Sequence, residues 1–420
     1  MMKNQRCIKA AALMVCTAML SSLCGCHEYL YEPKDEKPKI SFSWWGSDEL
    51  NSCTLTGLSK FTENTGVTVI PQYEEFSGFK SKMDTQVYSD NEPDVMQLNY
   101  DWLYQYTSDG EKFSDLSQLN EINLSTYPAG SLDCGTIDGE LMAVPYGMNA
   151  LSFLYNKTLY DSYGLKLPSK WDDLFEHAKI MRRDMVYPLA MTDKHFWLSS
   201  CAYLEQTTGK AVFGEDGQLA LTNEDIQIML KFTMELLDKK VCPPPLEYDR
   251  REFSMLRYAG VTSLASESGY FEDAANEMNM DLTTGPYPTT TYYRRYGWYV
   301  KPTGLYAIKK GSKHNHEAAE LINFLINSSE MATSLGMSKG VPVSTAAEES
   351  LEARGMLQGI EFEAHRQLMN EPRMMTMNPY MESDELVEIY TDAVNSIYYD
   401  EASITQAASK VYDKISDMKF

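Results

Sequence analysis

From residue 39 onward, strand-like and helix-like segments alternate regularly, and this alternation leaves few folds open to the chain. Ile40, Phe42 and Trp44 are apolar at every second position, which is typical of a β-strand. Leu58 and Phe61 then share one face of a helical pattern, which we expect Gly66 to end. Further strand-like segments lie at 67–73 and 94–98, and helix-like segments lie at 79–87 and from 102 onward. This order predicts an α/β layer built on a parallel sheet.

The alternation continues through the rest of the chain. Strand-like segments lie at 141–146, 152–155, 261–265 and 305–308, and helix-like segments lie at 171–181, 318–324 and through most of 383–418. Thr222 and Asp225 form a capping-box pattern that predicts another helix, whereas 283–291 is rich in turn residues and predicts a loop. A chain of 420 residues exceeds a single compact core, so we expect two domains.

The first 26 residues have the pattern of an export signal. The start is basic, and the apolar run at 10–20 is shorter than the ~20 residues of a membrane-spanning helix. The letters LCGC at 23–26 resemble the lipobox of bacterial lipoproteins. This resemblance implies that residues 1–25 are a signal peptide and that the sulfur of Cys26 carries a lipid anchor. An ordinary secretory signal, in which Cys26 has no role, is the alternative.

The rest of the chain is predicted to meet the membrane only through that anchor. Residues 26–38 are polar and contain two prolines, which indicates a tether, and no later run of 18 apolar residues follows. We therefore expect the protein at the extracellular face of the cytoplasmic membrane. Its formal net charge of −23, without a cluster of Lys or Arg, excludes nucleic acid as a partner.

The four later cysteines give no sign of metal or redox chemistry. Cys53, Cys134, Cys201 and Cys242 are far apart and include no C-x-x-C pair. Three disulfide pairings are open to them in an exported protein. We favour buried free thiols.

Catalytic and cofactor motifs are absent or out of context. The letters GMSKG at 336–340 match the G-x-S-x-G pattern of hydrolases, but a helical segment precedes them, so we interpret them as a helix-ending loop. The six histidines have no metal-binding spacing, and neither a P-loop nor a dinucleotide-binding motif is present. We therefore assign no catalytic residue, no metal and no cofactor. A glycoside hydrolase stays open as an alternative, because the sequence does not tell which of 60 acidic residues face each other.

Aromatic residues, 12% of the chain, supply the positive signal for a binding site. Those that follow predicted strands or lie in predicted loops are Trp44, Trp45, Tyr100, Trp102, Trp197 and Trp298. Asp48, Asp101 and Asn149 are close to some of them in sequence. A pyranose has apolar C–H faces and a rim of hydroxyls, which aromatic rings and carboxylate or amide groups complement. The pattern therefore favours a carbohydrate site, with core packing as the alternative for each single aromatic.

Several segments together carry a family resemblance. They are ISFSWWG at 40–46, PDVM at 93–96, YDWL at 100–103, PYG at 145–147, LYNK at 154–157 and KKGSKHNHEAAELINFLIN at 309–327. In order and spacing they resemble the family 1 extracellular solute-binding proteins, the carbohydrate receptors of ABC importers. The resemblance implies an α/β, periplasmic-binding-protein-like fold of type II, whose two lobes are joined by hinge strands and close on the sugar.

The same resemblance implies the lobes and the partners. The N-terminal lobe would hold residues 38–148 and 302–346, and the C-terminal lobe would hold residues 149–301 and 347–420. The partners would be a carbohydrate and the membrane permease subunits of an ABC importer. We expect the receptor to be a monomer.

The resemblance also assigns ligand contacts residue by residue. It places Trp44, Trp45 and Asp48 after the first strand, Tyr100 and Asp101 after the third, and Asn149 at the crossover, with Trp197, Tyr270 and Trp298 as candidates to stack on the sugar. Apart from the resemblance, Arg294 and Arg295 could meet an acidic sugar such as a uronate, but we favour a solvated loop as their role. Three functions compete on this basis: a sugar receptor, a surface-anchored glycoside hydrolase, and a structural or adhesive lipoprotein.

Overall fold

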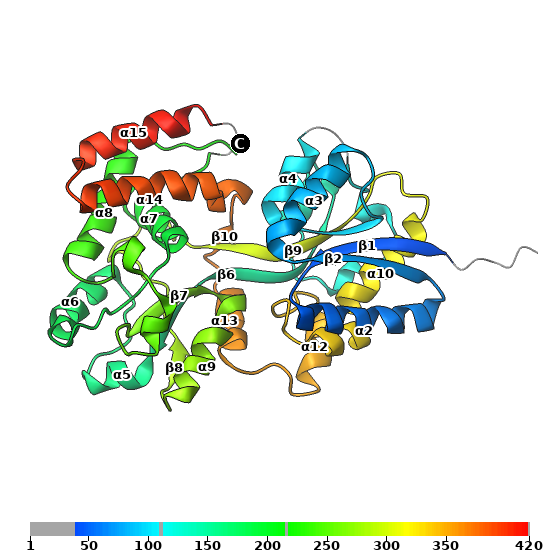
Figure 1. Cartoon of the computed structure of the whole chain (residues 1–420), viewed down its shortest axis with the longest axis horizontal. Helices are drawn as coiled ribbons and strands as arrows, with labels where there is room; N and C mark the ends of the chain where they lie inside the picture. The colour runs from blue at the N-terminus through cyan, green and yellow to red at the C-terminus, as the bar shows by residue number, and fades with distance from the viewer. Residues whose placement is uncertain (1–37, 109–111, 215–216, 419–420) are drawn as a thin grey trace, which may run out of the picture. The chain divides into compact units, whose positions relative to one another are not determined.

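A computed structural model describes residues 38–108, 112–214 and 217–418 (Figure 1). The predicted signal peptide at 1–25, the lipidated Cys26 and the tether up to residue 37 lie outside the described residues.

The first six elements follow the predicted alternation. They are β1 (Lys39–Trp45), α2 (Asp48–Thr65), β2 (Thr68–Glu74), α3 (Phe76–Tyr88), β3 (Val95–Leu98) and α4 (Tyr100–Thr107). The side chain of Ser47 caps the start of α2 by accepting from the backbone N–H of Leu50. Gly66 ends α2 in the left-handed region, at φ 80°, which glycine adopts without strain. These features confirm the prediction for this part of the chain.

The main sheet is mixed, so the prediction of a parallel sheet is only partly correct. Its order is β2-β1-β3-β9-β6-β7, and only the pairs β2–β1 and β1–β3 are parallel along this path. β6 (Val144–Asn156) pairs antiparallel with β9 (Tyr299–Ile308), with β7 (Gly260–Leu264) and with β8 (Leu282–Thr284). β9 also pairs antiparallel with β3 and parallel with β10 (Met375–Thr376). β6 carries the chain out of the first group of elements and β9 brings it back, so the two strands run in opposite directions.

Two local predictions also need correction. The segments expected as separate strands at 141–146 and 152–155 belong largely to the single long strand β6, because apolar residues continue through the residues between them. The predicted loop at 283–291 begins inside β8, which pairs with β6.

The remaining elements complete two groups that β6 and β9 connect (Figure 1). The further helices are α5 (Lys157–Ser162), α6 (Trp171–Met181), α7 (Asp193–Thr208), α8 (Asn223–Asp238), α9 (Gly269–Glu277), α10 (Asn315–Asn327), α11 (Ser329–Leu335), α12 (Thr345–Glu352), α13 (Ile360–Met369), α14 (Asp384–Tyr398) and α15 (Ile404–Ser416). Short strands β4 (Thr136–Ile137) and β5 (Glu140–Leu141) pair with each other. The predicted capping box of Thr222 and Asp225 is confirmed at the start of α8. Residues 336–340 follow α11 as a turn, as the prediction of a helix-ending loop requires.

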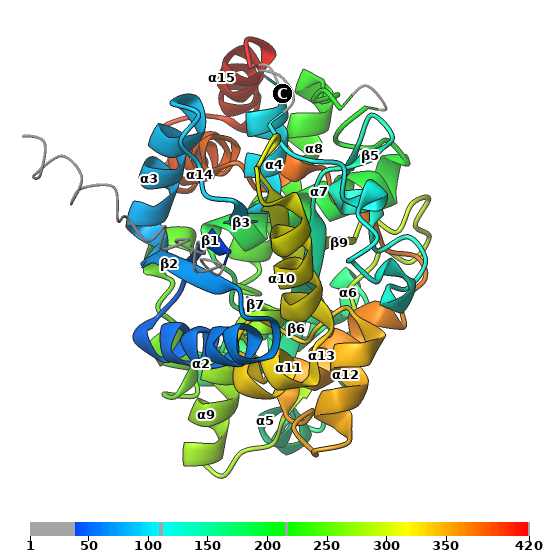
Figure 2. The same cartoon turned by 90° about the vertical axis from the view of Figure 1, so that its right-hand side faces the viewer.

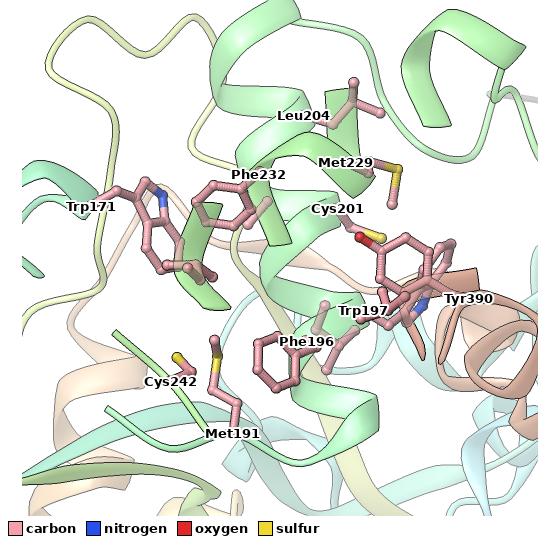
Figure 3. Close-up of a cluster of buried hydrophobic side chains, with 14 of the residues drawn as sticks. Trp171, Met191, Phe196, Trp197, Cys201, Leu204, Met229, Phe232, Cys242 and Tyr390 are labelled. Carbon is pink, nitrogen blue, oxygen red and sulfur yellow. The ribbon is translucent and has the colours of Figure 1, made fainter. Parts of the chain in front are cut away.

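Each group has its own hydrophobic core. In the first group, α2 and α11 lie on one side of β1 and β2, and α3 lies on the other (Figure 2). Ile40, Phe42 and Trp44 pack with Phe61 and Ile322 in one of these layers. In the second group, α6, α7, α8, α14 and α15 enclose a large aromatic cluster (Figure 3). Two cores joined by β6 and β9 correspond to the two lobes of the expected fold. The exact residues at which one lobe ends and the other begins stay a prediction.

The four described cysteines are free thiols, and Cys134, Cys201 and Cys242 are buried, in line with the prediction, whereas Cys53 is half-buried. Among the described residues, no helix combines the length and the apolar character needed to cross a membrane.

Candidate functional site

A cleft of about 660 Å³ lies where the two groups of elements meet the crossing strands. One side contributes Trp45, Phe76, Lys80, Tyr100, Asp101 and Trp102, and the other contributes Lys194, Leu264, Ser266, Glu267, Glu382 and Asp384. Asn149 of β6, Lys301 and Thr303 of β9, and residues 338–340 after α11 complete the lining named here. A ligand in this cleft would therefore touch both lobes.

Three aromatic side chains, which we call the aromatic wall, form one side of the cleft: Trp45, Phe76 and Trp102. Trp45 ends β1, Phe76 starts α3, and Trp102 lies in the first turn of α4. The rings of Phe76 and Trp102 stack at 5.7 Å between centroids, and Trp45 meets each of them edge-on. Phe76 is 52% exposed and Trp45 is half-buried, whereas Trp102 is only 4% exposed. The wall therefore offers flat apolar surface to a ligand mainly through Phe76 and Trp45.

Asp101 lies beside this wall. Its Oδ1 accepts a hydrogen bond of 2.8 Å from Asn99 Nδ2, and no ion pair to it is found in the described part of the chain. Burial raises the pKa of the Asp101 carboxyl above its ordinary value, although the positive charges of Lys80 and Lys301 act in the opposite direction. The carboxylate keeps acceptor capacity for the hydroxyls of a ligand.

Two other predicted contacts tie elements together at the cleft. Asn149 is buried, and its Nδ2 donates to Ser266 Oγ at 2.8 Å, while its Oδ1 accepts from the backbone N–H of Ala150. Tyr100 is 5% exposed, and its hydroxyl donates to the carbonyl of Met377. Both residues line the cleft. The bond of Asn149 links β6 to the segment that follows β7, and the bond of Tyr100 links α4 to the segment that follows β10.

Four lysines line the cleft, and they differ in their partners. Lys301 forms an ion pair with Glu382, and this pairing lowers the pKa of Glu382 even though burial acts to raise it. Lys80 Nζ lies 2.5 Å from Asp84 Oδ1. Lys194 lines the cleft on the other side. Lys339 is buried, and its Nζ donates to Gln97 Oε1 at 2.6 Å and to the hydroxyl of Tyr306 at 3.1 Å.

The structure brings four of the nine predicted ligand contacts into the cleft: Trp45, Tyr100, Asp101 and Asn149. That they bind a ligand stays a prediction. Sequence reasoning missed Phe76, Lys80, Lys194, Lys301 and Lys339. Phe76 follows the end of β2, so the rule that selected Trp45 applies to it as well. The lysines carry no local pattern that marks them.

The cleft placement predicted for the other three tryptophans is wrong. Trp44, Trp197 and Trp298 are at most 3% exposed. Each indole N–H donates within the core: that of Trp44 to Asn51 Oδ1, that of Trp197 to the carbonyl of Met381, and that of Trp298 to the carbonyl of Pro288. Trp197 packs on Tyr390 in the large core cluster (Figure 3). Side chains alternate along β1, so Trp44 and Trp45 face opposite sides of the sheet.

The remaining predicted contacts also lie outside the cleft lining. Asp48 is exposed in the first turn of α2, where a negative charge favours the helix N-terminus. Tyr270 lies on α9, and the guanidinium of Arg250 covers its ring at 4.2 Å. Arg295 Nε lies 2.6 Å from Glu205 Oε2, and Arg294 is exposed. In the part of the chain that the structure covers, no group of three or more side chains is arranged to hold a metal ion.

Comparison with protein families agrees with the fold. The family model described as bacterial extracellular solute-binding protein matches residues 56–332. The chain therefore belongs to this family of two-lobed binding proteins.

Solved structures resemble the chain over almost its whole length. A periplasmic solute-binding protein of Pectobacterium atrosepticum is 27% identical, covers 90% of this chain and 98% of its own, and has a TM-score of 0.83. An oligogalacturonide-binding protein of Yersinia enterocolitica, solved with saturated digalacturonic acid, is 26% identical, with coverages of 90% and 98% and a TM-score of 0.78. A de novo designed cysteine esterase is 26% identical, with coverages of 90% and 97% and a TM-score of 0.83.

Proposed function

We propose that this protein is a membrane-anchored extracellular receptor that binds a sugar or oligosaccharide in the cleft and delivers it unaltered to an ABC importer. The observation that carries the proposal is the aromatic wall beside a carboxylate, inside a cleft lined by both lobes. The family assignment supports a solute-binding role, and the oligogalacturonide bound by the Yersinia protein supports a carbohydrate as the solute.

The wall and the polar groups suit the two kinds of surface that a pyranose presents. The rings of Trp45 and Phe76, the latter stacked on the buried Trp102, would cover an apolar C–H face. Asp101 on the same side and polar groups on the other lobe would bond the hydroxyl rim. Because neither lobe alone supplies all of these contacts, a bound sugar would favour the closed arrangement of the lobes.

The test is a thermal-shift screen of the purified protein against mono- and oligosaccharides, followed by calorimetry. A ligand that binds only the folded state raises its melting temperature, by an amount that grows with concentration. We expect at least one saccharide to do so and to be recovered uncut by chromatography. A product formed from that saccharide would instead favour the surface-anchored glycoside hydrolase. No response to any saccharide would favour a structural or adhesive lipoprotein.

The anchor and the delivery need their own tests. Cys26→Ala should abolish incorporation of labelled fatty acid, while a substitution at Cys24 should leave it. Labelling that persists in Cys26→Ala would refute the anchor. Deletion of the cognate permease should stop uptake of the labelled sugar while leaving its binding to the receptor unchanged.

A further inference from the structure

Lys339 differs from the other cleft lysines in its surroundings. It lies in the turn after α11, next to Gly340, whose φ of 84° is in the left-handed region. It lines the cleft and yet is only 8% exposed. The rings of Tyr146 and Tyr306 lie with their centroids 5.3 Å from its Nζ. The ammonium group is therefore held in the cleft wall by neutral and aromatic neighbours.

No carboxylate within the described residues pairs with this ammonium. Gln97 Oε1 and the Tyr306 hydroxyl accept two of its three N–H groups. Lys301 and Lys80, in contrast, have Glu382 and Asp84 as partners, and the charge of the half-buried Lys194 acts on Glu382 as well. A buried cation without an opposite charge is costly, and the cost falls when an anion binds beside it.

We infer that Lys339 recognises the carboxylate of an acidic sugar, so that the preferred ligand of the cleft is a uronate-containing saccharide. This inference rests on the proposed function, since it names the chemical class of the sugar. The aromatic wall would bind neutral and acidic pyranoses alike, because both have apolar C–H faces. A charged partner on Lys339 would then decide between them, through a charge-assisted hydrogen bond. The formal net charge of −23 opposes an anion at long range, so the preference must come from this short-range contact.

If a bound carboxylate changes the protonation of Lys339, the number of protons taken up on binding can be measured. Burial lowers the pKa of the Lys339 ammonium to about 7. Tyr146 and Tyr306, whose rings flank it, have pKa values that burial raises, so both stay neutral. A bound carboxylate favours the charged amine, so binding above pH 7 should draw a proton from solution.

The experiment is calorimetry of the full chain with two matched probes, α-1,4-digalacturonate and its neutral counterpart α-1,4-galactobiose. Titrations in two buffers of different ionisation enthalpy give the number of protons taken up. We expect digalacturonate to bind at least about tenfold tighter, with an uptake of close to one proton at pH 8 and little at pH 6. Galactobiose should bind without that uptake.

Three variants assign the effect to one side chain. Lys339→Gln should lower the affinity for digalacturonate by about 10- to 100-fold, remove the proton uptake and leave galactobiose binding nearly unchanged. Lys339→Arg should keep part of the preference for the uronate but lose the uptake, because arginine stays charged. Lys60→Gln is the matched control, since this exposed lysine of α2 pairs with Glu63 outside the cleft lining and carries the same charge. It should behave as the wild type.

The outcomes separate the inference from the proposed function. Equal affinities for the two probes without proton uptake, measured on the wild type, would overturn the inference even if no variant folds. So would a uronate preference that Lys339→Gln leaves intact. A neutral saccharide that binds while digalacturonate does not would refute the role of Lys339 and keep the receptor. Absence of binding by every saccharide would refute the receptor itself.

Discussion

The two sides of β1 are both rich in aromatic residues, and they lie in different surroundings. On one side, Trp44 is fully buried, stacks on Phe42 at 4.9 Å and has its indole N–H bonded to Asn51. On the other side, Trp45 is half-buried and belongs to the aromatic wall of the cleft. Of two adjacent tryptophans, one therefore packs in the core and the other lines the cleft, because side chains alternate across a strand.

The largest effect should come from the buried member of this pair. Trp44→Ala removes a fully buried indole and leaves its partner Asn51 without that donor, so the free energy of unfolding should fall by about 3–5 kcal/mol. Denaturant unfolding followed by circular dichroism measures this loss. A loss below about 1 kcal/mol would contradict the assignment of Trp44 to the core.

The half-buried member, Trp45, should lose affinity more than stability. Trp45→Ala removes one ring of the wall, so the affinity for the bound saccharide should fall by about 10- to 100-fold, or roughly 1.4–2.7 kcal/mol. The free energy of unfolding should fall clearly less than in Trp44→Ala. Calorimetry and unfolding of the same two proteins make the comparison. Wild-type affinity in Trp45→Ala would remove the wall from the site.

The carboxylate beside the wall should matter in a pH-dependent way. Asp101→Ala should weaken the binding of a neutral sugar by about five- to 100-fold, since ligand hydroxyls lose an acceptor in the cleft. Burial raises the pKa of Asp101, so wild-type affinity should decrease as the pH falls through this raised pKa and the carboxylate is protonated. Asp101→Asn should lose that decrease. Identical pH profiles for the wild type and Asp101→Asn would show that Asp101 does not accept from the ligand.

The smallest expected effect is a loss of stability at α8, far from β1 in the sequence, and it serves as a reference for the variants of β1. Thr222→Ala removes one half of the capping box of α8 and should cost about 1 kcal/mol of stability, with no change in sugar affinity.

Asp225, the other residue of that capping box, should make the stability of the protein depend on pH. Burial acts to raise the pKa of Asp225, but hydrogen bonds from Thr222 and Lys210 outweigh it and lower the pKa below the ordinary value. The stability that Asp225 contributes is therefore present above the unfolded pKa of about 4 and is lost as the pH falls through the lowered folded pKa. Acid unfolding of the wild type and Asp225→Asn should diverge as the pH rises toward the unfolded pKa of about 4, and parallel curves would contradict this.

Much of the fold could be predicted because its elements have local signals. Neighbouring residues alone predict three features: the alternation of apolar residues in β1, the end of α2 at Gly66 and the capping box at Thr222. The structure has all three. The direction of β9 has no such signal, since it depends on where the chain returns after about 140 residues between β6 and β9. The sequence therefore suggested a parallel sheet where the structure has a mixed one.

The site could be predicted only in part, because some of its residues meet only through tertiary structure. Residues after the first and third strands share one edge of the sheet, which is why Trp45 and Asp101 meet in the cleft. The two-residue period places Trp44 and Trp45 on opposite sides, but nothing local tells which side a second lobe faces. Lys339 lines the cleft from a turn more than 230 residues after Asp101, so its position there depends on tertiary structure alone.

A crystal structure of the protein with the saccharide that raises its melting temperature most would test the central claim directly. We predict electron density for an uncut sugar in the cleft, with a pyranose face against Trp45, Phe76 or Trp102 and contacts to both lobes. Density for the sugar elsewhere on the molecule, with the cleft holding only solvent, would contradict this account.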